Sequence, residues 1–235
     1  MPETPRLTLP LLEAAQAQKH VSVNEALARL DTLAAQRAED LGLTTPPATP
    51  ADGTLFGIGS GAGGAWAGQD GRMALYLNGG WAFADPWEGW QLYDASTGAL
   101  ALYRSGAWVG GVAGGSPGGA LTLSRVIEVE HTLSAGAVST TPALIPDKAV
   151  VLGASARVTQ AIAGATSWSL GVSGAPDRYG VGYGVAQGAY AAGVTGQPQA
   201  YYGATALTLT AEGGAFSAGA VRLAVHLLEI VPPPA

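Results

Sequence analysis

The chain has 235 residues, enough for one large domain or two small ones, and contains no cysteine. It therefore forms neither disulfides nor thiolate metal sites. Its net charge of −6 argues against a nucleic-acid groove or an anionic membrane surface as partner. No apolar run approaches the roughly 18 residues of a membrane span, and residues 1–10 lack the layout of a secretory signal. We therefore expect a soluble chain that is made in the cytoplasm.

The composition favours short strands over helices. Glycine accounts for 35 residues, and charged residues make up only 12% of the chain while hydrophobic residues make up 48%. Disordered chains combine low hydrophobicity with high charge, which is the opposite pattern. An apolar, glycine-rich and weakly charged chain is typical of many strands joined by tight turns. The predicted fold class is therefore mainly β, with short N-terminal helices, a small antiparallel meander and a C-terminal β-sandwich of the jelly-roll kind.

The first predicted segment, residues 1–45, is helical. Capping and proline signals predict two helices, over about 9–19 and 23–41. Apolar residues recur at steps of three and four in the second helix and give it one apolar stripe. This segment is either an independent helical hairpin or a docking element, because an amphipathic stripe needs a surface to cover it. The stripe residues expected to dock are Leu27, Leu30, Leu33 and Leu41.

The second predicted segment, residues 46–112, is a tryptophan- and glycine-rich β module. It contains a repeat, in which DGRMALYLNGGW at 70–81 matches TGALALYRSGAW at 97–108 in six of twelve positions. Each copy reads as a strand, a tight Asn-Gly or Ser-Gly turn, and a tryptophan that opens the next strand. Two copies are too few for a solenoid and suit a small antiparallel meander.

Five of the six tryptophans lie in this module. Aromatic rings stack on sugar rings or fill protein pockets, so the cluster is either a glycan platform or the core of the meander. The acids near these tryptophans would accept hydrogen bonds from sugar hydroxyls. The predicted glycan-binding residues here are Trp81, Asp85, Trp87, Glu88 and Trp90.

Residues 110–119, GGVAGGSPGG, read as a flexible linker and as the best domain boundary. The third segment, residues 120–235, reads as a sandwich because short strand candidates alternate with glycine clusters. It holds a second polar and aromatic group, which is either a binding face or a structural turn with core tyrosines. Its members are Trp168, Asp177, Arg178, Tyr179, Tyr201 and Tyr202.

The sequence offers no convincing catalytic constellation. Its three histidines, at 20, 131 and 226, lack metal-ligand spacing. Glycosidases need two facing carboxylates, and Asp85 with Glu88 is the nearest approach to such a pair. We therefore expect no enzymatic activity, no metal and no cofactor.

A family resemblance adds to this interpretation. The stretch Pro5–Leu33, PRLTLPLLEAAQAQKHVSVNEALARLDTL, resembles the N-terminal signature of the DUF2793 family, and QAQKHVSVNEAL at Gln16–Leu27 is its most specific part. The region Thr49–Trp108 is similar to the family's usual continuation, and parts of the C-terminal segment resemble its longer members. The resemblance implies a place among proteins of tailed phages and gene transfer agents that are associated with head spikes or fibres and host-surface attachment. It implies no catalytic residues.

The leading hypothesis is therefore a structural component of a virion or particle surface, a head spike or fibre protein, assembled in the bacterial cytoplasm. Its N-terminal stripe would attach it to capsid or other spike and fibre proteins, and its aromatic surfaces would bind cell-surface polysaccharide. We expect a homo-oligomer, with a trimer as first choice and a pentamer as the alternative. Two other classes stay open: a polysaccharide-degrading spike enzyme and a glycan-binding module of a cellular protein.

Overall fold

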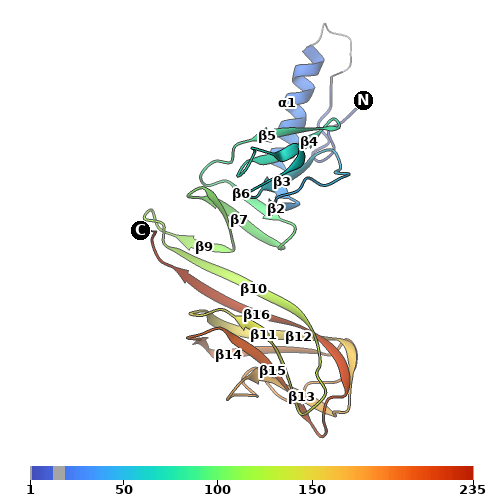
Figure 1. Ribbon diagram of the computed structural model, residues 1–235, viewed down its shortest axis with the longest axis vertical. Helices are drawn as coiled ribbons and strands as arrows, with labels where there is room; N and C mark the ends of the chain where they lie inside the picture. The colour runs from blue at the N-terminus through green and yellow to red at the C-terminus, as the bar shows by residue number, and fades with distance from the viewer. Residues whose placement is uncertain (1, 13–18, 235) are drawn as a thin grey trace. The chain divides into compact units, whose positions relative to one another are not determined.

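The structure, a computed structural model, describes residues 2–12 and 19–234, and the chain divides into two compact units, Met1–Val112 and Ala113–Ala235. Strands dominate both units (Figure 1), which confirms the predicted fold class. The division falls inside the glycine-rich stretch 110–119. Part of that stretch is itself a strand, β9 (Val112–Gly115).

In the first unit, the described residues form one helix, α1 (Lys19–Ala34), a 3-10 turn at Gly64–Trp66, and two four-stranded sheets. The strands of one sheet, in spatial order, are β2 (Asp40–Leu43), β3 (Thr54–Ile58), β4 (Met73–Leu77) and β5 (Gly80–Ala84). Those of the other are β1 (Arg37–Ala38), β6 (Gln91–Asp94), β7 (Ala99–Arg104) and β8 (Ala107–Gly110). Each sheet pairs one short parallel strand with three antiparallel ones.

The sequence repeat corresponds to two equivalent hairpins, β4–β5 and β7–β8. Their turns place Asn78 and Ser105 at φ 52° and 51°, each followed by a glycine that also has positive φ. This is the geometry of type I′ turns, which match the twist of the flanking strands. In each hairpin a tyrosine faces a tryptophan across the strands, with ring centroids 4.9 Å apart in the first and 5.2 Å in the second. The two hairpins lie in different sheets, so the expected single meander is in fact two.

The prediction of helices at 9–19 and 23–41 is confirmed for residues 23–34 and is wrong for residues 9–12 and 37–41. Residues 9–12 are not helical, and residues 13–18 lie outside the described residues. The helix α1 ends at Ala34, and Gln36, at φ 49°, turns the chain into strands β1 and β2. These strands form because β6 and β3 offer them parallel pairing, and tertiary pairing of this kind overrides helix propensity. Leu41 consequently lies in β2 and not on a helix.

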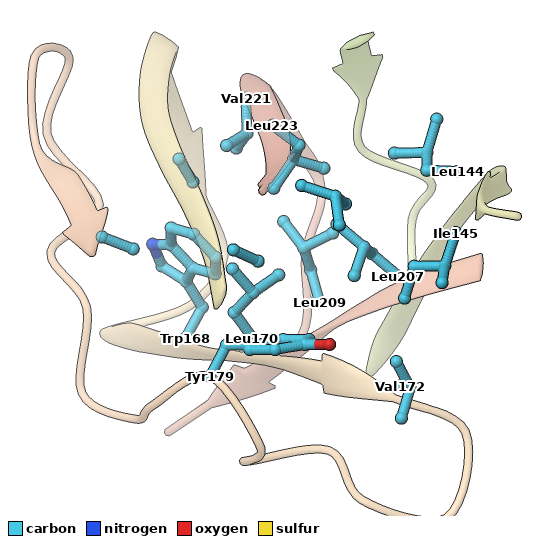
Figure 2. Packing of buried hydrophobic residues seen from close by; sticks show 14 of the residues in the cluster. Leu144, Ile145, Trp168, Leu170, Val172, Tyr179, Leu207, Leu209, Val221 and Leu223 are labelled. Carbon is cyan, nitrogen blue, oxygen red and sulfur yellow. The ribbon is translucent and has the colours of Figure 1, made fainter. Parts of the chain in front are cut away.

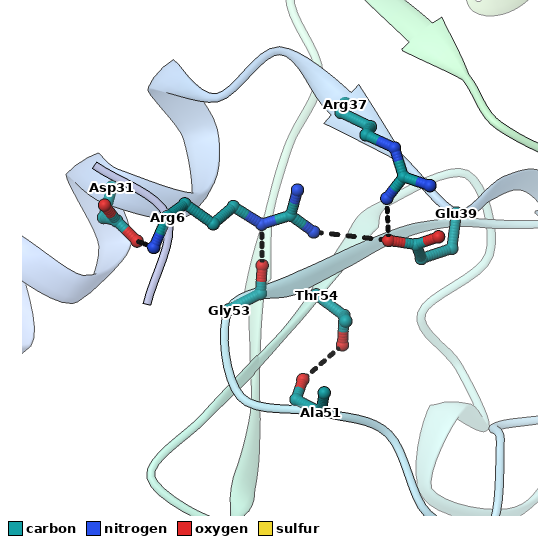
Figure 3. A network of polar contacts seen from close by, with 7 residues as sticks. All are labelled: Arg6, Asp31, Arg37, Glu39, Ala51, Gly53 and Thr54. Carbon is teal, nitrogen blue, oxygen red and sulfur yellow. Dashed lines mark hydrogen bonds and ion pairs between the residues drawn. The ribbon is translucent and has the colours of Figure 1, made fainter. Parts of the chain in front are cut away.

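A buried polar network holds residues 2–12 against α1 (Figure 3). The carboxylate of Asp31 is fully buried and accepts hydrogen bonds from the Thr4 hydroxyl (2.8 Å) and from the backbone N–H groups of Arg6 (3.0 Å) and Leu7 (2.5 Å). The Arg6 guanidinium donates to the Gly53 carbonyl and forms an ion pair with Glu39. Asp31 is therefore a structural anion that fixes the N-terminal segment, because buried charges need this degree of hydrogen bonding.

The second unit is a sandwich of two antiparallel sheets. The large sheet has the order β14-β12-β16-β10-β9 and the small one the order β11-β15-β13. Their remaining bounds are β10 (Leu121–Thr132), β11 (Val138–Ile145), β12 (Val150–Ala163), β13 (Ser167–Val172), β14 (Tyr190–Ala200), β15 (Thr205–Glu212) and β16 (Ala218–Val231). Consecutive strands from β10 to β13 alternate between the sheets, as in a jelly roll.

The core of this unit lies between its two sheets (Figure 2). The large sheet contributes the alternate residues Val221, Leu223, Val225 and Leu227 of β16, and the small sheet contributes Leu207 and Leu209 of β15. The predicted alternation at 126–130 is confirmed, since Ile127 and Val129 pack on this core while Glu128 and Glu130 are exposed.

Candidate binding surface

The helix α1 carries an apolar stripe on its outer side. Its inner side is occupied by the buried residues Asp31 and Thr32 and by Leu33, which packs on the core of the first unit. The outer positions recur at steps of three and four, the spacing of one helix face. They are Val23, Ala26, Leu27, Leu30 and Ala34, of which Leu27 is half-buried and the others are exposed. Leu30 is the most exposed of the large residues on this stripe, at 56%.

The predicted docking leucines therefore separate. Leu27 and Leu30 lie on the outer stripe, whereas Leu33 and Leu41 pack against the core formed by the two sheets. The helical spacing of the four leucines made them look equivalent in the sequence. Only the packing of α1 distinguishes a leucine that stabilises the fold from one that is left for a partner.

A shallow groove of about 500 Å³ continues the stripe toward the loop between β5 and β6. Its walls are apolar on the helix side and aromatic on the other, with two glutamine side chains between them. The residues that line it are Leu30, Leu33, Ala34, Gln36, Trp87, Gly89, Trp90 and Gln91. None of these residues is charged, so the groove fits an apolar or neutral partner.

The aromatic wall is a stacked pair of indoles. The rings of Trp87 and Trp90 lie 4.0 Å apart and are inclined by only 5°. Trp90 is buried beside Trp108, with centroids 5.7 Å apart, whereas Trp87 is 54% exposed. A tight turn positions the pair, because Gly89 at φ 86° reverses the chain between them. Trp87 is therefore an outward-facing ring held in place by a core tryptophan.

The other predicted residues of this module have structural partners. Asp85 forms an ion pair with Arg72 at 2.6 Å, and Glu88 accepts a hydrogen bond from the Ser105 backbone N–H at 2.9 Å. Trp81 is half-buried against Trp66, with ring centroids 4.9 Å apart, and lines a separate groove beside Val21 of α1. The predicted single platform thus divides into a core cluster around Trp66 and the exposed Trp87.

The second aromatic group is also divided. Trp168 and Tyr179 are buried, and the Trp168 indole donates to the Gly184 carbonyl at 3.0 Å. The Tyr179 and Tyr201 hydroxyls are hydrogen-bonded at 2.8 Å, and burial, with help from this contact, raises the pKa of Tyr179 far above its usual value. Neither buried ring is available for stacking on a ligand.

The exposed members of that group are Asp177, Arg178 and Tyr202. Arg178 donates to the Gln199 side chain at 3.0 Å, and Tyr202 is 90% exposed. Asp177 and Arg178 lie in the turn that follows β13, and Tyr202 lies in the loop between β14 and β15.

The described residues hold no cluster of three or more histidine, aspartate or glutamate side chains that would bind a metal ion. No helix in the described part of the chain is both long and apolar enough to cross a membrane. The Trp87 groove and the outer stripe of α1 are therefore the best candidate surface for binding.

The sequence did not predict that Leu30 and Trp87 share one groove. It assigned Leu30 to a docking stripe and Trp87 to a glycan platform, in two different segments. The helix and the loop come together because both pack on the core that holds Leu33 and Trp90. No local pattern in the sequence encodes that contact.

Comparison with known proteins gives a family match and a partial structural likeness. No curated protein matches it. A solved structure titled "Cyanophage Pam1 capsid asymmetric unit" is 25% identical over 51% of this chain and 91% of that chain, with a TM-score of 0.37. A family model described as a protein of unknown function, DUF2793, matches residues 23–109, which include the outer stripe of α1 and the Trp87 groove. The resemblance to the DUF2793 family is thus confirmed as a match of the family model to residues 23–109 of this chain.

Proposed function

We propose that this chain is a non-catalytic structural component on the surface of a phage or gene-transfer-agent particle. It docks onto capsid or other spike and fibre proteins through the outer stripe of α1 and the adjoining groove. The observation that carries the proposal is the exposure of both Leu30 (56%) and Trp87 (54%) in the lining of one uncharged groove. The family resemblance supports the particle context, and this surface lies within the residues that the family model matches.

The physical argument is the cost of leaving these side chains in water. Burying a large apolar side chain contributes about 1.5–3 kcal/mol. A stripe at helical spacing that ends in an aromatic groove presents several such side chains together, and exposed patches of this kind mark interaction sites. Because the surface carries little charge, the docked partner has to be apolar at the contact.

The direct test is to make the substitution Leu30→Asp in the gene and to measure how much of the variant chain is incorporated into particles. The substitution places an uncompensated carboxylate in the contact, and burying an unpaired charge is strongly unfavourable. We expect the variant chain to fold normally and to be lost from purified particles. Leu100→Asp is the matched control, because Leu100 is 65% exposed in the same unit but lies on β7, outside the groove. Normal incorporation of the Leu30→Asp chain would refute the docking site.

Electron microscopy of particles with and without the gene tests the wider proposal. A projection should disappear from particles that lack the chain. Particles of unchanged appearance, or the absence of the chain from purified particles, would refute a structural role and would leave a cellular glycan-binding module as the alternative.

A second candidate function, attachment to host-surface polysaccharide, is favoured by the exposed indole of Trp87. Its groove also offers the amide side chains of Gln36 and Gln91 as hydrogen-bond partners for sugar hydroxyls. The test is Trp87→Ala alone, since Trp90 is a core residue. If Trp87 binds glycan, the variant should enter particles normally but should lose adsorption to host cells and glycan-array binding.

The two candidates compete for one groove, so the same variants separate them. Loss of incorporation by both Leu30→Asp and Trp87→Ala indicates a protein partner. Normal incorporation with lost adsorption indicates glycan. A polysaccharide-degrading activity would appear as released oligosaccharides, and we expect none, because Asp85 and Glu88 are engaged by Arg72 and by the Ser105 backbone.

A further inference from the structure

The turn of the first hairpin, β4–β5, contains the one Asn-Gly sequence of the chain, Asn78-Gly79. The side-chain carboxamide of an asparagine before glycine is open to attack by the backbone nitrogen of that glycine, because glycine has no side chain to obstruct the approach. Both residues are exposed, and a Cβ built on Gly79 would meet no atom within 4 Å. Water therefore reaches this turn, and no neighbouring residue crowds it.

The backbone nitrogen of Gly79 is not used by the β4–β5 ladder. In a two-residue turn the ladder resumes at the flanking residues, here the paired Leu77 and Gly80. The Gly79 N–H instead donates to the carboxylate of Asp52 at 3.2 Å. Asp52 is exposed and lies in the turn before β3. A carboxylate in this position can accept the proton that the nitrogen loses as it attacks.

The two Asp-Gly sequences of the chain, at 52–53 and 70–71, could react by the same route but have a different arrangement. In both, the glycine N–H donates to a backbone carbonyl, that of Tyr76 at 2.8 Å and that of Ile58 at 3.0 Å. A backbone carbonyl is too weak a base to take up the proton. These two sites are therefore held in an unreactive state by the fold.

The second asparagine of the chain, Asn24, is also held. It lies in α1, and its carboxamide accepts a hydrogen bond from the Leu12 N–H at 2.8 Å and donates one to the Leu12 carbonyl at 3.0 Å. The residue that follows it is Glu25, whose side chain obstructs attack. Of the two asparagines, Asn78 alone combines exposure, a following glycine and an adjacent carboxylate.

We propose that Asn78 is a deamidation site at which the Asp52 carboxylate serves as the proton acceptor. The Gly79 nitrogen loses its proton to Asp52 and bonds to the carboxamide carbon of Asn78. The carboxamide nitrogen takes up that proton and leaves as ammonia, which closes a five-membered imide. Water then adds to either carbonyl of the imide and opens it. The products are aspartate and isoaspartate, each with a carboxylate in place of a neutral amide.

The modification changes both the turn and the groove beside it. Isoaspartate adds a methylene to the backbone, whereas the type I′ turn fits two residues of positive φ, here 52° at Asn78 and 77° at Gly79. The new carboxylate repels Asp52, which is bound to the next residue. Asn78 also lines a groove of about 400 Å³ with Glu25 and Arg29 of α1, and this groove gains a negative charge.

Mass spectrometry of the full chain after incubation at neutral pH tests the site, without particles and independently of the docking proposal. Trypsin places Asn78 in peptide 73–104 and Asn24 in peptide 20–29, so one digest follows both asparagines. We expect peptide 73–104 to gain the mass difference between an amide and an acid, while peptide 20–29 stays unchanged. A chain unfolded in urea is incubated alongside, to show that the conditions allow the reaction.

Two variants separate the roles of the residues. Asn78→Ser copies the Ser-Gly turn of the equivalent hairpin β7–β8 and should abolish the mass gain, which excludes Gln91 of the same peptide as its source. Asp52→Ser removes the proton acceptor and keeps Asn78-Gly79. A positioned base contributes about a hundredfold or more inside an enzyme, and an exposed carboxylate should give less, so we expect this variant to react about tenfold more slowly.

Asp147→Ser is the matched control, because it removes an exposed carboxylate in the second unit and should react like the wild type. Near-UV circular dichroism should show that all variants are folded. A folded wild type whose peptide 73–104 gains no mass, while the unfolded chain does, would overturn the inference. So would an Asp52→Ser chain that reacts as fast as the wild type, or an Asn78→Ser chain that gains the same mass.

Discussion

Asp31 offers the sharpest test of how the first unit is held together. Its buried carboxylate accepts three hydrogen bonds from residues 4–7. In Asp31→Ala these donors lose their acceptor. Hydrogen bonds to a charged group contribute about 1.5–3 kcal/mol each while the donors stay buried. Because residues 2–12 can leave the helix and bind water instead, we expect the loss of local stability to stop at about 3 kcal/mol, which equals one or two such bonds.

Trypsin cleavage after Arg6 is the assay for this release. The Arg6 side chain is only 18% exposed and is held by Gly53 and Glu39. A loss of about 3 kcal/mol in local stability raises the population of the open segment about a hundredfold, and the cleavage rate follows that population when opening is fast. Mass spectrometry of the shortened chain gives the rate directly.

Two control variants sharpen the result. Asp31→Asn keeps one acceptor oxygen and should release the segment less than Asp31→Ala. Asp147→Ala removes an exposed carboxylate in the second unit and should change nothing. If Asp31→Ala is cleaved after Arg6 no faster than Asp147→Ala, the carboxylate does not hold the segment and the reasoning is refuted.

Two further predictions concern the second unit. Burial lowers the pKa of His131, whose ring is hydrogen-bonded to the Ser139 hydroxyl at 2.8 Å. As the pH falls, the unfolded chain therefore binds a proton at this histidine before the folded chain does. The free energy of unfolding should decrease from about pH 6.5 downward, until the pH has passed the lowered pKa of the folded state. Urea titrations at several pH values should show this slope in the wild type and a flatter one in His131→Asn. A Cβ at Gly193 would lie 1.9 Å from the Tyr179 carbonyl oxygen, so Gly193→Ala should lower the melting temperature through a loss of about 1–3 kcal/mol or more. Gly196→Ala, on the same strand with no atom within 4 Å, should leave it within the error of calorimetry.

The hairpins show how far local pattern reaches. The Asn-Gly and Ser-Gly dipeptides predicted tight turns, and both turns form as expected because positive φ at two successive positions is a local property. Local patterns also predicted the strand at 126–130, from its alternation, and the sandwich of the second unit, from strand candidates separated by glycine clusters. Composition also indicated the fold class, since a chain rich in glycine and poor in charge has few routes to a core other than strands and turns.

The composition of each sheet in the first unit depends on residues that are distant in sequence from its hairpin. Residues 37–41 were predicted to be helical, and residues 37–43 instead form strands β1 and β2 because β6 and β3 present unpaired edges to them. Parallel pairing of this kind joins segments that are distant in sequence, and a short periodic pattern carries no information about it. The helix prediction failed at this point for that reason.

The candidate binding surface also depends partly on local sequence and partly on tertiary packing. The sequence by itself determined that apolar residues recur along the helix and that Trp87 lies in a loop. Only the tertiary structure decided that Leu33 and Trp90 turn into the core while Leu30 and Trp87 stay exposed and meet in one groove. Side chains of the same type are equivalent in a pattern, and they become different when packing buries one and leaves the other in water.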